Sequence, residues 1–143
     1  MIRPLCVALA LLAVGAVAVA ADKELAYSQT AGTITLDGKV IGKGYSGHGK
    51  GLNNPAREKE RNVGPIPAGT YSVGKAFKHD SKGPIVMRLT PTGHKAHGRD
   101  GFLIHGDNPD GNKSASEGCI ILGREVREKI AESGVTKLRV VKE

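Results

Sequence analysis

Apolar residues along this chain occur in short runs separated by glycine and polar residues, a pattern typical of a mainly β protein. Asp37 and Gly38 stand between two such runs, and this dipeptide tolerates the positive φ angles that a two-residue hairpin turn requires. The pattern predicts strands over residues 33–36, 40–41, 70–76, 84–90 and 138–141.

One helix is predicted near the C-terminus, over residues 124–133. Val126, Ile130 and Ala131 are expected on its inward face, and Gly134 is expected to end it. No internal repeat or linker interrupts the chain. We therefore predict one domain over residues 22–143, mainly β, as a small β-sandwich or barrel with one short C-terminal helix.

The first 21 residues have the three regions of a secretory signal peptide. Arg3 supplies the positive charge, an uncharged apolar run extends from Leu5 to Ala20, and small residues close the segment. A transmembrane anchor is the alternative, but the run is rich in alanine and shorter than the roughly 20 residues that a span needs. We expect export to the periplasm or cell envelope, or secretion, without a stable membrane anchor.

Removal of the signal peptide would also remove Cys6 and leave Cys119 as the chain's one thiol. A single thiol cannot form an internal disulfide. Cys119 is therefore a candidate reactive group, with an intermolecular disulfide as the alternative.

His105 and Cys119 stand at the facing ends of two apolar runs. Residues 106–112 between them are turn formers, which predicts a surface loop and lets the two runs pair as strands with both side chains adjacent. A thiol is mostly protonated at neutral pH, and a neighbouring imidazole can act as its base.

Gly118 lacks a β-carbon, so the backbone before Cys119 can turn sharply and present the N–H groups of both residues to an oxyanion. Ser116 could add a hydroxyl to the same pocket. The spacing alone leaves a second interpretation open, in which Cys119 is a small buried hydrophobe.

Two segments together resemble a known catalytic signature. Ile104-His105-Gly106 and Ser116-Glu117-Gly118-Cys119-Ile120 resemble the His…Ser-x-Gly-Cys signature of L,D-transpeptidases of the YkuD-like superfamily. Upstream blocks resemble the branch that contains type VI secretion L,D-transpeptidase effectors. These blocks are Tyr45-Ser46-Gly47, Asn53-Asn54-Pro55 and the segment 64–71.

The resemblance implies the same β fold and cysteine-dependent acyl transfer on peptidoglycan stem peptides, as an L,D-transpeptidase or as an L,D-carboxypeptidase that releases terminal D-Ala from tetrapeptides. Cys119 would be the nucleophile and His105 the general base. Gly118 and Ser116 would support the oxyanion. Asp107, or a backbone carbonyl, would orient His105, and Gly106 would support it.

Two departures from the superfamily pattern affect substrate recognition. Glu117 stands where many members have histidine, and Ile121 and Leu122 stand where arginine or asparagine often follows the cysteine. The residue that binds the substrate carboxylate is therefore not assigned by the motif. Tyr45, Arg99 and Arg124 are candidates for substrate binding, with Arg88 a further arginine to consider.

The formal charge is +7, or +6 once Arg3 is removed with the signal peptide. Cell-wall polymer, anionic lipid and nucleic acid are possible acidic partners, but a chain without Trp has little with which to stack bases. His94 and His97 lack a neighbouring Cys, Asp or Glu cluster that would complete a zinc site. We expect a monomer that acts on peptidoglycan stem peptides, with no metal, cofactor or nucleic acid.

A non-catalytic peptidoglycan-binding envelope protein is the alternative function. The sequence leaves open whether the acyl group passes to water or to an amine, and whether the target is the cell's own wall or that of a rival.

Overall fold

The computed structural model describes residues 13–16 and 23–143. Most of the predicted signal peptide, residues 1–21, lies outside the described residues. In the described part of the chain, no helix is both long enough and apolar enough to span a membrane.

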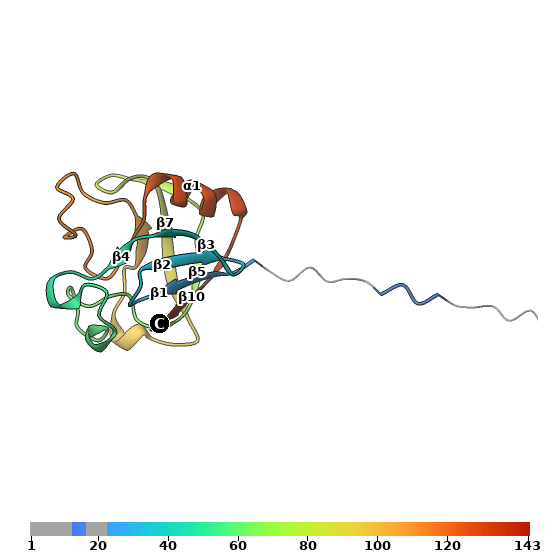
Figure 1. Cartoon of the computed structure of the whole chain (residues 1–143), viewed down its shortest axis with the longest axis horizontal. Helices are drawn as coiled ribbons and strands as arrows, with labels where there is room; N and C mark the ends of the chain where they lie inside the picture. Colours follow the sequence, from blue (N-terminus) through green and yellow to red (C-terminus); the bar gives the residue numbers. More distant parts are fainter. Residues whose placement is uncertain (1–12, 17–22) are drawn as a thin grey trace, which may run out of the picture.

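The described chain is mainly β, with a single α-helix near the C-terminus (Figure 1). This confirms the predicted fold class. The strands are β1 (Leu25–Ser28), β2 (Thr33–Leu36), β3 (Lys39–Lys43), β4 (Tyr45–Ser46), β5 (Gly69–Val73), β6 (Phe77–His79), β7 (Gly83–Thr92), β8 (Leu103–His105), β9 (Ile120–Ile121) and β10 (Lys137–Val141). The helix is α1 (Arg124–Ser133), and three short 3-10 turns are η1 (Gly49–Gly51), η2 (Pro55–Arg57) and η3 (Ala96–Gly98).

The strands form one open sheet in the order β3-β2-β1-β10-β5-β7-β8-β9-β4. The pair β8–β9 is parallel, as is β1–β10, and the other neighbours are antiparallel. The long strand β7 is central because it pairs with β5, β6 and β8. Two long loops, residues 47–68 and 106–119, lie at the left side of the sheet in Figure 1.

Local sequence explains where several elements begin and end. Asp37 and Gly38 have φ angles of 49° and 82° in the turn between β2 and β3, as the hairpin prediction requires. Gly134 ends α1 in the left-handed conformation with φ 70°. Ile130 is buried on the inner face of α1, but Ala131 is exposed, and the charged residue Arg127 is buried on the inner face instead.

The core lies between the sheet and α1, which crosses near β7 (Figure 1). The largest fully buried side chains are Tyr27, Tyr71, Leu25, Ile34, Ile66, Met87, Ile104, Ile120, Leu122, Ile130, Leu138 and His105. His105 is the only ionisable side chain in this group other than tyrosine. Its burial places an ionisable group at the end of β8, inside the core.

Candidate active site

The parallel pairing of β8 with β9 brings His105 and Cys119 to one face of the sheet. Ile104 lies opposite Ile120 in the register, and both are fully buried in the core. Because side chains alternate along a strand, Leu103 and His105 point to the opposite face, as does Cys119 just before β9. The predicted side-by-side placement of the histidine and the cysteine follows from this register.

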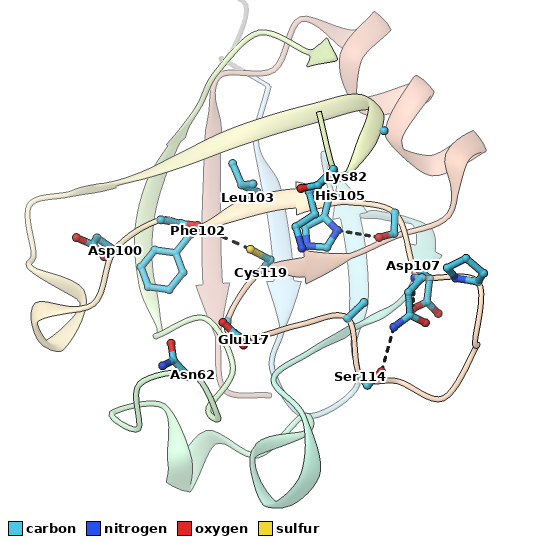
Figure 2. Close-up of a pocket in the computed structure, with 18 residues that line it drawn as sticks. Asn62, Lys82, Asp100, Phe102, Leu103, His105, Asp107, Ser114, Glu117 and Cys119 are labelled. Carbon is cyan, nitrogen blue, oxygen red and sulfur yellow. Dashed lines mark hydrogen bonds between the residues drawn. The ribbon is translucent and has the colours of Figure 1, made fainter. Parts of the chain in front are cut away.

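A cavity of about 720 Å³ opens over this face. Figure 2 shows the His105 ring and the Cys119 sulfur next to each other within it. The lining residues come from the 47–68 loop, from the β6–β7 turn, from β8 with the segment before it, and from the 106–119 loop. They are Asn62, Ser81, Lys82, Gly83, residues 100–103, residues 105–109, Ser114, Ala115 and residues 117–119.

The hydrogen bond at Nδ1 of His105 determines which ring nitrogen can act as a base. Nδ1 lies 2.7 Å from the backbone carbonyl oxygen of Gly106. A carbonyl oxygen only accepts, so Nδ1 donates its hydrogen and the neutral ring keeps a lone pair on Nε2. Nε2 is buried and has no hydrogen-bond partner in the described chain. His105 therefore presents a basic nitrogen with no other use in the fold.

Burial favours the uncharged forms of both Cys119 and His105. Burial raises the pKa of the Cys119 thiol, although the Leu103 N–H opposes the rise, and burial lowers the pKa of His105. The half-buried Cys119 Sγ lies 3.8 Å from the Gly101 carbonyl oxygen, and in the described chain no hydrogen bond joins the thiol to His105. Such contacts often tighten only when substrate binds.

Position 118 requires glycine because of its backbone conformation and because Arg99 packs against it. Its φ is 131°, a region that side-chain-bearing residues rarely adopt, and a β-carbon there would lie 2.5 Å from Nη2 of Arg99. However, its N–H donates a hydrogen bond of 3.1 Å to Oγ of Ser116. The expectation that the Gly118 N–H is free for an oxyanion is therefore wrong for this conformation.

Ser116 has a structural role instead of lending its hydroxyl to the cavity. The side chain is fully buried, and Oγ donates to the Cys119 carbonyl at 2.6 Å. The same oxygen accepts from Gly47 N–H at 2.8 Å as well as from Gly118 N–H. These three bonds fix the turn that carries Cys119, because all of them hold backbone groups.

Arg99 is not available to bind a substrate carboxylate. The side chain is 5% exposed, and its guanidinium donates only to backbone carbonyls in the described chain. The acceptors are Glu58 at 2.6 Å, Pro65 at 2.8 Å, and Gly64 and Glu117 at 3.0 Å each. Arg99 thus ties the 47–68 loop to the residue that precedes Gly118, and its expected substrate role is replaced by a positioning role.

Tyr45 and Asp107 bind each other rather than substrate or His105. The Tyr45 hydroxyl donates to Oδ1 of Asp107 at 2.7 Å and accepts from Ala115 N–H at 3.2 Å. The Gly106 carbonyl, the other option considered for orienting the imidazole, holds the ring of His105. Tyr45 is buried outside the cavity lining and joins the two ends of the 106–119 loop.

The remaining arginine candidates lie away from the cavity lining. Arg124 is exposed on α1, where it pairs with Glu128 at 2.9 Å. Arg88 is exposed and stacks over the ring of Phe77 at 5.9 Å. Neither placement supports contact with a substrate at Cys119.

The other histidines serve local structure. His94 bonds to the Thr70 carbonyl at 2.8 Å, and His97 lies 3.4 Å from the Glu58 carboxylate. Nδ1 of His48 lies 2.8 Å from the carbonyl of Ser116. Within residues 13–16 and 23–143, no cluster of three or more His, Cys, Asp or Glu side chains could hold a metal ion.

Two residues of the site were not found from the sequence. Lys82 lines the cavity from the β6–β7 turn, but a lone lysine in a polar turn carries no signal of its own. Arg127 lies beneath Gly106, where a β-carbon would be 2.8 Å from its Nη2. A sequence signal for Arg127 did exist, because it is three residues before Ile130 on the predicted inner face of the helix.

Comparisons with known proteins concern the family and the fold of the chain. The family model of the Tlde1 domain matches residues 41–143. No curated protein sequence matches the chain. A solved structure of the LD transpeptidase LdtMt1 in complex with imipenem is 17% identical, with a TM-score of 0.51, over 83% of this chain and 58% of the other.

A structure of L,D-transpeptidase 1 from Mycobacterium tuberculosis is 19% identical, with a TM-score of 0.49, over 84% of this chain and 62% of the other. This chain therefore matches about six tenths of the length of either solved protein. At such low identity, the likeness to LdtMt1 establishes the fold, and the family rests on the domain match. The chain belongs to the Tlde1 domain family, as its resemblance to the type VI secretion L,D-transpeptidase effectors predicts.

Proposed function

We propose that this protein is a cysteine acyltransferase that acts on peptidoglycan stem peptides, as an L,D-transpeptidase, an L,D-carboxypeptidase, or both. One observation carries the proposal. The unpartnered Nε2 of His105 is buried on the same face of the sheet as the Cys119 thiol, inside a cavity. A buried nitrogen base without a partner costs stability, so a catalytic use explains its presence.

In the proposed reaction, the Cys119 sulfur attacks the carbonyl carbon at the L-centre of the diamino acid in a tetrapeptide stem. The sulfur–carbon bond forms while the thiol proton passes to Nε2 of His105. The carbon–nitrogen bond to the terminal D-Ala then breaks, and His105 returns the proton to the leaving nitrogen. The products are free D-Ala and a thioester on Cys119.

The preference of Cys119 and His105 for their uncharged forms determines when the proton is transferred. Burial stabilises the uncharged forms of both side chains, so a standing thiolate–imidazolium pair is disfavoured. We propose that the proton moves to His105 as the sulfur attacks. The Nδ1 hydrogen bond to the Gly106 carbonyl would strengthen as the ring becomes positively charged.

The tetrahedral intermediate needs a donor for its oxyanion, and we assign this role to the Cys119 N–H. The Gly118 N–H would contribute only if it left Ser116 Oγ. Loss of one such donor typically costs on the order of 10² to 10³ in rate. The thioester can pass to water or to an amine, which distinguishes carboxypeptidase from transpeptidase activity.

We further propose that the predicted signal peptide exports residues 22–143, as a monomer, to the periplasm or cell envelope, or out of the cell. The Tlde1 domain match and the L,D-transpeptidase fold are compatible with action on an exported substrate.

Digestion of purified tetrapeptide muropeptides, read by mass spectrometry, tests the proposed reaction. We expect the wild-type chain to remove one alanine residue or to produce a cross-linked dimer. Cys119→Ala should do neither, and His105→Ala should lower the rate by at least about 10². Unchanged muropeptides with a correctly folded wild-type chain would contradict the proposal.

Thiol labelling separates the enzyme from a non-catalytic wall-binding protein. Intact mass after incubation with a carbapenem should show one adduct on Cys119, with slower formation in His105→Ala. Muropeptide binding without cleavage and without an adduct would support the binding protein.

A further inference from the structure

The charges around the cavity are not evenly distributed. Among the described residues that line it, Lys82 is the only lysine or arginine, whereas Asp100, Asp107 and Glu117 are acidic. Asp107 already accepts bonds from Tyr45 and from its neighbour's N–H, and Asp100 lies 3.6 Å from Arg61. In the described chain, no carboxylate lies within salt-bridge distance of the Lys82 ammonium. The cavity therefore has one cation that is free for a ligand.

The backbone that carries Lys82 is held in place from two sides. Nδ1 of His79 accepts hydrogen bonds from the N–H groups of Ser81 and Lys82, at 3.1 and 3.2 Å. Just beyond the turn, the Arg127 guanidinium donates to the carbonyls of Pro84 and Ile85, at 2.8 and 3.1 Å. The turn is thus fixed by side chains that do not use the lysine side chain.

Lys82 lies on the histidine side of the nucleophile. Figure 2 shows it beside His105, whereas Asp100 and Glu117 lie on the other side of the Cys119 sulfur. The charge of Lys82 also lowers the pKa of both His105 and Cys119, which agrees with a position close to both.

The chemistry of amide cleavage indicates which part of the substrate lies on the His105 side of Cys119. The leaving nitrogen must face His105, because His105 gives it the proton. In a C-terminal residue, the α-carboxylate is only two bonds from that nitrogen. The carboxylate of the leaving residue must therefore lie near His105, whereas the acyl part of the stem extends toward the opposite side of Cys119.

We propose that Lys82 binds the α-carboxylate of the leaving C-terminal residue. This inference rests on the proposed acyl-transfer function and adds its substrate selectivity. Lys82 would favour bonds to a C-terminal residue with a free carboxylate over internal peptide bonds and over stems whose carboxylate is amidated. It also supplies the carboxylate-binding residue that the sequence motif did not assign.

A matched pair of substrates tests this directly. One is the stem tetrapeptide that ends in D-Ala, and the other is the same peptide that ends in D-alaninamide. We expect wild-type kcat/KM to be about tenfold higher for the acid, mainly through KM, since a charge-assisted contact at an exposed site has roughly this value. The ratio between the two substrates isolates the contact, because any change in the thiol pKa affects both equally.

Substitutions of Lys82 should change the preference for the acid over the amide. Lys82→Met should bring the acid-to-amide ratio close to one, and Lys82→Arg should keep most of it. Lys78→Met is the matched control, because Lys78 is an exposed lysine on β6 that does not line the cavity, and it should leave the ratio unchanged. A wild-type ratio near one, or an undiminished ratio in Lys82→Met, would overturn the inference.

A binding measurement separates failure of this inference from failure of the proposed reaction. In the Cys119→Ala background, calorimetry should show weaker binding of the amide than of the acid, and Lys82→Met should abolish that difference. If the wild-type chain cleaves neither peptide but this difference is present, the reaction is wrong and the carboxylate site stands. If cleavage occurs but Lys82→Met keeps the difference in binding, the carboxylate site is wrong and the reaction stands.

Discussion

Two buried arginines hold the two halves of the site in the same way. Arg99 lies under the Cys119 turn and Arg127 under the His105 segment, with exposed fractions of 5% and 8%. In the described chain, each guanidinium donates only to backbone carbonyls. Each also has a glycine packed against its Nη2, Gly118 for Arg99 and Gly106 for Arg127.

The two halves differ in what the arginines hold. Arg127 connects the end of β9 to the central strand, since its acceptors are Leu122, directly after β9, and two residues of β7. Arg99 joins irregular backbone, namely the 47–68 loop and Glu117. The histidine half also has strand pairing to maintain it, whereas the cysteine half depends on side-chain bonds to loops. The position of Cys119 should therefore be more sensitive than that of His105 to loss of its arginine or its glycine.

The largest effect is expected for Gly118→Ala compared with Gly106→Ala. A methyl group at 118 meets both the Arg99 guanidinium and a φ of 131°, whereas position 106 has only the contact with Arg127. We expect Gly118→Ala to lower kcat for muropeptide cleavage on the order of 10² to 10³, because a shifted turn would displace the Cys119 N–H, the proposed oxyanion donor. The fall in kcat for Gly106→Ala should be about tenfold smaller than the fall for Gly118→Ala. Equal losses would contradict the proposed difference between the two halves.

The second-largest effect is expected for substitution of Arg99 or Arg127. Arg99→Met removes four hydrogen bonds to backbone carbonyls, three of them buried, and Arg127→Met removes three, one of them buried. Because the lost bonds are buried or partly buried, we expect each variant to lose roughly 3–5 kcal/mol of unfolding free energy, and Arg99→Met should lose more because more of its bonds are buried. Urea denaturation measures both values. Arg124→Met is the control on the exposed face of α1, and it should change stability by less than about 0.5 kcal/mol.

His105 and Cys119 should each change the dependence of folding stability on pH, one on the acidic side and one on the alkaline side of neutral pH. Burial lowers the pKa of His105 below its usual 6.5, so below that pH the unfolded chain binds a proton that the folded chain does not. Burial raises the pKa of Cys119 above its usual 9.0, so above pH 9.0 the unfolded chain releases a proton that the folded chain retains. Both effects destabilise the fold, one on each side of neutral pH.

Urea denaturation from pH 5 to pH 10 tests these signs. His105→Gln should reduce the loss of stability on the acidic side alone, and Cys119→Ser should reduce it on the alkaline side alone. If stability rose as the pH fell below 6.5, or if His105→Gln changed the alkaline side, the burial argument would be wrong.

The sequence predicts the regular elements and the reactive pair better than the groups that position them. The helix bounds match because Gly134 and the periodic apolar residues are local signals. His105 and Cys119 come together because the two apolar runs around them pair in register. The partners of Arg99 and Tyr45 are 18 to 70 residues away in sequence, and no local pattern encodes such contacts.

The use of the Gly118 N–H was mispredicted for a different reason, because its acceptor Ser116 is only two residues away in sequence. The flexibility of glycine indicates that its backbone can turn, but it does not indicate which acceptor its N–H will meet. Ser116 was recognised as part of the site, but its bond to the Gly47 N–H joins residues 69 apart in sequence, and its two local bonds depend on how the turn closes.

The smallest effect is expected for Tyr45→Phe, which removes one hydroxyl from the 106–119 loop. This hydroxyl bonds to Asp107 and to the N–H of Ala115, and burial together with the Asp107 bond raises the pKa of Tyr45 to about 12. Because the ring stays in place, we expect a loss of about 1–2 kcal/mol in urea denaturation. Faster hydrogen exchange should be confined to residues 107–115, and kcat should fall less than in Gly118→Ala. A loss of activity as large as that of Gly118→Ala would mean that Tyr45 contacts the reacting groups. The distinction between the turn that carries Cys119 and the loop that supports it would then be wrong.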